Sequence, residues 1–116
     1  MSDLPIIECI AGDTTDVIEL ALQINKERTF PLELTTLDGN YTCKITVEGA
    51  PVAINRNVPD KTADNKYFRG WLTPAETTSL PPADYILAMQ ISNATLTPNL
   101  VKTKRWTLRI IADPLP

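Results

Sequence analysis

Apolar and polar residues alternate over several parts of the chain, and a period of two is typical of strands that bury one face. The clearest case runs from Tyr41 to Glu48. Its apolar positions are expected to point inward and the intervening positions to face water; the inward set is Tyr41, Cys43, Ile45 and Val47. Phe30, Leu32 and Leu34 share one face before it, and residues 38–40, Asp-Gly-Asn, have turn composition. The two runs predict a β-hairpin.

Other segments show similar alternation and complete an all-β pattern. They span residues 18–24, 52–54, 67–72, 85–91 and 106–110, and a polar loop is expected at 58–66. Seven or so strands are typical of an immunoglobulin-like sandwich. We therefore predict one antiparallel β-sandwich domain over residues 1–116, with about 7–9 strands. At 116 residues the chain has the length of one ordinary domain.

One short helical turn is predicted between two of these strands. Thr73 has the hydroxyl of an N-cap, Pro74 suits the first helical position and Glu76 completes a capping box. Pro81 and Pro82 follow closely and end the helix. We expect a helix confined to residues 74–80.

The first 19 residues allow two interpretations. Residues 5–10 form a short apolar run, which the turn-like Gly12-Asp13 follows. This run is either an extra edge strand of the same domain or a strand that pairs with the edge of a neighbouring subunit. In the second case Ile6 and Ile7 belong to an interaction surface.

Composition argues against several classes of protein. The chain has 43% hydrophobic and 22% charged residues, no apolar run long enough for a membrane span, and no signal-like start. A net charge of −3 gives no general attraction to nucleic acid. Cys9 and Cys43 are expected to be free, buried thiols of a protein that folds in a cytoplasm.

The sequence has no histidine, which removes the commonest nucleophilic, general-base and zinc chemistry. The pairs Asp13/Asp16 and Asp60/Asp64 are better interpreted as turn residues than as calcium ligands. The basic residues of segment 102–109 occupy both faces of one strand, as on a charged edge. We expect no catalytic, cofactor-binding or metal-binding residues, and a small hydrolase using paired acids is the least favoured alternative.

Three aromatic residues, Tyr67, Phe68 and Trp71, lie within five positions. If Tyr67 and Trp71 face outward, they form a platform for sugar or protein contact. The competing interpretation is that this cluster fills the core, because the chain has few aromatic residues. Carbohydrate binding is therefore an alternative that we do not favour.

Four passages resemble a family of small bacteriophage structural proteins related to the N-terminal domain of baseplate upper proteins. They are residues 28–32 (RTFPL), 37–40 (LDGN), 72–77 (LTPAET) and 80–85 (LPPADY). Ala83 stands where that family usually has glycine. The resemblance implies a non-enzymatic virion component, folded in the host cytoplasm, in a tail, baseplate or neck. Its expected partners are further copies of itself and other virion proteins.

Overall fold

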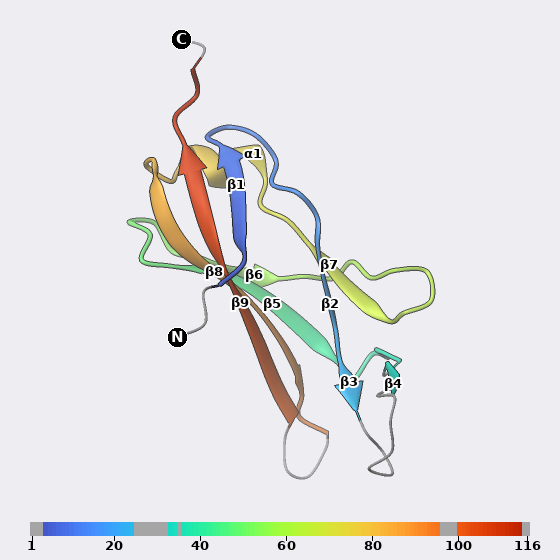
Figure 1. Cartoon of the computed structure of the whole chain (residues 1–116). Helices are drawn as coiled ribbons and strands as arrows, with labels where there is room; N and C mark the ends of the chain where they lie inside the picture. The colour runs from blue at the N-terminus through green and yellow to red at the C-terminus, as the bar shows by residue number, and fades with distance from the viewer. Residues whose placement is uncertain (1–3, 25–32, 35, 96–99, 115–116) are drawn as a thin grey trace.

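The structure is a computed structural model that describes residues 4–24, 33–34, 36–95 and 100–114 (Figure 1). These residues form an all-β fold with a single short helix among them, as the alternation predicts. The elements are β1 (Ile6–Ile10), β2 (Ile18–Ala21), β3 (Gln23–Ile24), β4 (Glu33–Leu34), β5 (Thr42–Glu48), β6 (Ile54–Asn57), β7 (Tyr67–Gly70), α1 (Pro74–Thr78), β8 (Ala83–Asn93) and β9 (Leu100–Ile111).

The main sheet has five strands in the order β1-β9-β8-β5-β6. The long β8 and β9 form its centre and pair antiparallel from Ala83↔Ile110 to Asn93↔Leu100. β1 pairs with β9 in parallel, from Ile6↔Thr107 to Ile10↔Ile111. The expectation of a wholly antiparallel arrangement is therefore wrong for this pair. A parallel pair needs a crossover connection, and here almost the entire chain lies between the two strands.

The predicted hairpin between residues 30–34 and 41–48 is also wrong. β4 pairs with β3, while β5 lies between β6 and β8. The turn before β5 does form, since the Tyr41 amide donates to the Asp38 carbonyl at 3.1 Å and the Asn40 amide to the Asp38 carboxylate at 2.8 Å. Both edges of β5 are occupied by other strands, so this turn does not join two paired strands. Phe30 and Leu32 lie outside the described residues.

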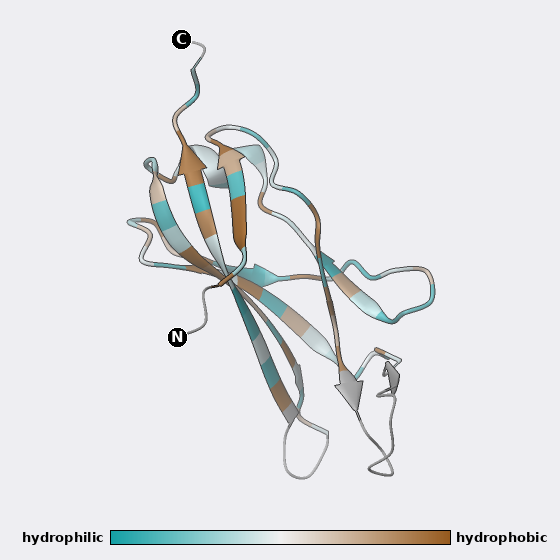
Figure 2. Ribbon diagram, in the orientation of Figure 1, coloured by the Kyte–Doolittle hydropathy of each residue, from teal (hydrophilic) through white to brown (hydrophobic). Residues whose placement is uncertain are grey.

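The core lies on one face of the main sheet, and Figure 2 shows apolar and polar residues alternating along its strands. β2 and β7 pair antiparallel as a separate ladder and contribute to the same core. The close approach of β7 to β8 depends on Gly70, because a Cβ there would lie 3.0 Å from Met89 Cε. Buried apolar residues include Ile18, Leu20, Leu22, Cys43, Ile45, Val47, Phe68, Leu87, Met89, Ile91, Trp106, Leu108 and Ile110.

The shorter elements mostly match their expected positions. Thr73 is the N-cap of α1, and both hydrogen bonds of the predicted capping box with Glu76 are present. The helix ends at Thr78, inside the predicted range. The expected strand at 52–54 begins only at Ile54, because Val52 is 52% exposed and precedes the β6 ladder.

Candidate interaction surfaces

The two candidate residues of β1 lie on opposite faces of the main sheet. Ile6 is 54% exposed on the outer face, which points away from the core. Ile7 is half-buried and packs against the core. Consecutive residues of a strand point to opposite sides, so only Ile6 of this pair is available for contact. The run itself is an edge strand that pairs within its own chain, the first of the two interpretations of this segment.

Tyr67 and Trp71 are both half-buried, at the start of β7 and one residue beyond its end. Four positions of extended chain separate them by about 13 Å, and the exposed Arg69 lies between them on the same strand face. Phe68 between them is buried, with the Lys61 ammonium 5.6 Å from its ring centroid. The aromatic cluster is thus divided between core and surface, and it lies on a different sheet from Ile6.

The outer face of the main sheet carries a charged group flanked by exposed isoleucines. Arg109 of β9 contacts Glu8 of β1 at 3.4 Å and Asp84 of β8 at 3.0 Å. Ile6, Ile10 and Ile111 are 54%, 36% and 40% exposed around it. The sequence alone does not predict this surface, because it forms only when β1 pairs with β9. The one local indication is that Ile6, Glu8 and Ile10 occupy alternate positions and so share one face of a strand.

The remainder of the outer face is mostly polar, although Val101 of β9 is 60% exposed on it. Arg105 lies 3.8 Å from Glu48, and the Gln90 amide donates to the Thr103 hydroxyl at 3.0 Å. Thr42 and Ser92 share a hydrogen bond of 3.1 Å between their hydroxyls. Charges of both signs alternate with small hydroxyl side chains, which suits contact with another polar protein surface better than binding of one highly charged ligand.

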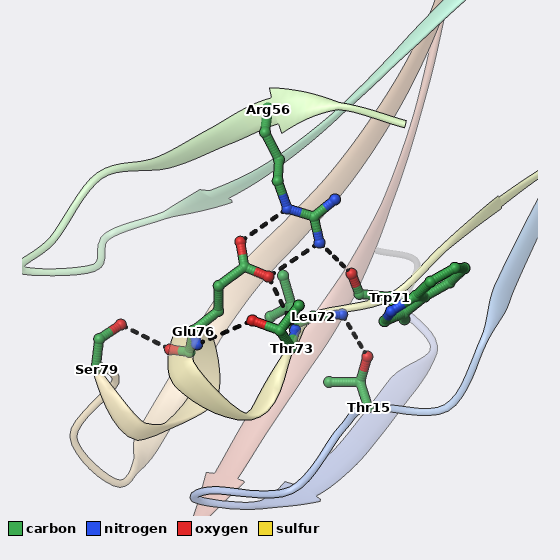
Figure 3. A network of polar contacts seen from close by, with 7 residues as sticks. All are labelled: Thr15, Arg56, Trp71, Leu72, Thr73, Glu76 and Ser79. Carbon is green, nitrogen blue, oxygen red and sulfur yellow. Dashed lines mark hydrogen bonds and ion pairs between the residues drawn. The ribbon is translucent and has the colours of Figure 1, made fainter. Parts of the chain in front are cut away.

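A partly buried polar network connects β6, α1 and the segment before β2 (Figure 3). Arg56 contacts the Glu76 carboxylate through two hydrogen bonds of 2.9 Å and also donates to the Trp71 carbonyl. Glu76 accepts from the Thr73 amide at 2.9 Å. The Thr15 hydroxyl accepts from the Leu72 amide at 2.8 Å, which attaches the N-terminal segment to the same place.

The Arg56–Glu76 pair resembles an acid–base pair but is arranged for structure. Burial alone would raise the pKa of Glu76, but hydrogen bonds from Arg56 and Thr73 outweigh burial and hold this pKa below its ordinary value. The same bonds to Glu76 raise the pKa of Arg56. Both groups stay charged and directed at each other at neutral pH, so the pair fixes α1 against β6.

Both cysteines are free and buried, as expected from the sequence. Burial raises the pKa of the Cys43 thiol to about 12, and burial together with Asp13 and Asp16 raises that of Cys9. Neither thiol is activated as a nucleophile. Of the other acidic pair, Asp64 accepts hydrogen bonds from Thr62 and the Lys66 amide inside its own turn.

Within the part of the chain that the structure describes, no three potential ligands gather as a metal site would require. Nor do these residues include a helix with the length and apolar composition needed to cross a membrane. No protein-family model matches the chain, and no curated protein or solved structure is significantly similar to it.

Proposed function

We propose that the chain is a non-enzymatic structural protein of a bacteriophage virion, which acts in a tail, baseplate or neck through contacts with other copies and other virion proteins. The observation that carries this proposal is the outer face of the main sheet. It spans all five strands and exposes isoleucines beside paired charges. An apolar patch rimmed by polar groups is typical of a protein contact surface.

The phage assignment rests on the resemblance at residues 72–77 and 80–85, a passage that lies between β7 and β8. The first part is the capped helix α1, and the second leads into β8. The Tyr85 hydroxyl at the start of β8 donates back to the Pro81 carbonyl. The two motifs thus form one continuous connection between β7 and β8.

We further propose that the fold is immunoglobulin-like. In sequence order, β2, β5, β6, β7, β8 and β9 correspond to strands B, C, C′, E, F and G of such a sandwich. The order β9-β8-β5-β6 then matches G-F-C-C′, and β2 with β7 matches B with E. The hydrogen bond from Tyr85 to Pro81 occupies the place of the tyrosine corner before strand F.

Mass spectrometry of purified particles tests the virion role. If the chain is a virion component, particles of the phage that encodes it contain the chain at a fixed copy number that survives density-gradient purification. The same measurement on the lysate supernatant provides the control. Loss of the chain from particles during purification, with full recovery in the supernatant, would contradict the proposal.

A second candidate function is carbohydrate or receptor binding through Tyr67 and Trp71, which is supported by their partial exposure at the start of β7 and one residue beyond its end. Trp71→Ala tests it on a glycan array, with Tyr41→Ala as a matched aromatic control elsewhere on the molecule. Glycan binding that Trp71→Ala abolishes at an unchanged melting temperature would favour this candidate. Absence of glycan binding by the native chain would exclude it.

A further inference from the structure

The outer edge of β1 presents backbone groups that no other described strand pairs, although the Ile10 carbonyl accepts from the Asp13 amide of its own chain at 3.0 Å. The Pro5 carbonyl accepts from the Thr107 amide at 2.8 Å, and the Ala11 amide donates to the Ile111 carbonyl at 2.9 Å. The backbone amide and carbonyl groups of the odd-numbered residues in this segment therefore point toward β9. Because backbone groups alternate in direction along a strand, those of Ile6, Glu8 and Ile10 point away from β9. Among the described strands, none pairs with β1 on that side.

The two edges of the main sheet differ in chemistry. β6, at the far edge, has the sequence INRN, and its outward-directed Asn55 and Asn57 are exposed. β1 has the sequence IIECI, in which four of five residues are apolar. Natural edge strands are usually protected by charged side chains, especially lysine, by proline or by a bulge. β1 has no lysine or proline, pairs without a bulge through five consecutive positions, and carries one charged residue, Glu8.

The pattern of β1 is symmetric about Glu8. Ile6 and Ile10 lie two residues to either side on the outer face, and Ile7 and Cys9 lie one residue to either side on the inner face. An antiparallel pair of two identical strands centred on Glu8 therefore places Ile6 opposite Ile10 of the other copy, twice. A two-fold interface requires this kind of self-complementarity.

We propose that a second copy of this chain pairs through β1, antiparallel and with the two-fold axis at Glu8, so that two five-stranded sheets join into one of ten strands. This inference deepens the assembly function proposed above and rests on it. The backbone groups of Ile6 and Glu8 and the amide of Ile10 supply the hydrogen bonds. The Ile10 carbonyl, which already accepts from the Asp13 amide at 3.0 Å, accepts a second bond through its other lone pair. Ile10 packs beside Ile6 of the other copy on the outer face, and Ile111 extends the apolar patch on the far side of Ile10.

The axis brings the two Glu8 side chains together, which opposes association. Arg109 of each copy, 3.4 Å from its own Glu8, partly neutralises them. Like charges directly opposite each other weaken a pair of strands. Glu8→Gln is therefore expected to lower the dimer dissociation constant by about two- to fivefold. A basic partner bound to Glu8 would give the opposite result, because its affinity would fall.

Analytical ultracentrifugation of the full chain over a concentration series tests the pairing. Glu8→Pro removes an outward amide but no hydrogen bond to β9, because the Glu8 amide points away from that strand. The matched control is Asn55→Pro, whose amide points outward at the β6 edge. We expect a dimer for the native chain and for Asn55→Pro, and a monomer for Glu8→Pro with a retained melting transition.

If Glu8→Pro fails to fold, the double variant Ile6→Lys/Ile10→Lys tests the pairing in its place. Both side chains are exposed, so the variant is expected to fold and to be monomeric. A dimer that survives in the double variant would overturn the inference, as would a dimer in folded Glu8→Pro, a weaker dimer in Glu8→Gln or a monomeric native chain. These results leave the virion proposal standing, since particle composition tests that proposal separately.

Discussion

Ile45 and Thr46 are neighbours on β5 that differ in environment. Ile45 is 0% exposed in the core, whereas Thr46 faces outward. We expect Ile45→Ala to lower the free energy of unfolding by about 2–5 kcal/mol, because it leaves a cavity. Thr46→Ala should change it by less than about 0.5 kcal/mol. Urea titration of both variants checks this, and equal effects would contradict the assignment of faces.

The Cys43 thiol is expected to be unreactive in the folded protein. It is 2% exposed, and burial raises its pKa to about 12, so at pH 8 almost none of it is thiolate. A disulfide reagent should label Cys43 in a Cys9→Ser variant only as fast as the protein unfolds. Labelling in native buffer as fast as in urea would show that the strand pairing around Cys43 is wrong.

At this scale the sequence was most informative for positions inside long alternating runs. Residues 43, 45 and 47 were assigned correctly to the core because their run is long and regular. Trp71 and Tyr67 could not be placed, because the exposure of an aromatic side chain at a strand end depends on what packs over it. The sequence interpretation places Ile6 and Ile7 on one surface, although consecutive residues of a strand point to opposite faces.

Among single elements, α1 depends on Glu76, and this gives a prediction about pH. Because the folded pKa of Glu76 is lowered, its contribution to stability is complete above the unfolded pKa of about 4.3. That contribution is lost as pH falls through the lower folded value. Glu76→Gln keeps the capping hydrogen bond but not the charge.

The variant should therefore be less stable than the native chain at pH 7, by about 1 kcal/mol because Arg56 is partly exposed. The difference should shrink as the pH falls below 4. Thermal melts of both proteins from pH 7 to pH 3 measure it. A difference that stays constant with pH would mean that the Arg56–Glu76 pair adds no charge-dependent stability.

The connection between α1 and β8 is stabilised by the hydrogen bond from Tyr85 to Pro81. Tyr85→Phe removes the hydroxyl that donates to the Pro81 carbonyl and keeps the buried ring. We expect a loss of about 1 kcal/mol in unfolding free energy, the usual net worth of one hydrogen bond. Tyr41→Phe, at a half-buried tyrosine outside the corner, is the control. A Tyr85→Phe variant as stable as the native chain would remove the support that this hydrogen bond gives to the immunoglobulin-like assignment.

The elements themselves could largely be predicted, but their partners could not. The turn at Asp38–Asn40 was recognised from local chemistry, yet β5 pairs with β8 some 40 residues further on. Local turn residues cannot determine which strand meets which, because pairing depends on total burial over the finished sheet. The parallel pairing of β1 was missed for the same reason, since Glu8 and Arg109 are 101 positions apart.

The main sheet of the molecule depends on its last strand, β9, for completion. β9 pairs with both β1 and β8 and supplies Trp106, Leu108 and Ile110 to the core. A chain that ends at residue 99 is therefore expected to lose cooperative unfolding altogether. Near-ultraviolet circular dichroism during heating checks this through the remaining Trp71. A sharp transition close to that of the full chain would show that the rest of the domain folds without β9.

The parallel pairing of β1 with β9 also determines how copies of this domain can be linked covalently. The two strands run in one direction, so the chain enters and leaves at opposite ends of their shared ladder. A circular permutant would need a linker that runs back along five paired residues, about 17 Å. Tandem fusions, in contrast, need only a short spacer, and every domain in such a string would point the same way.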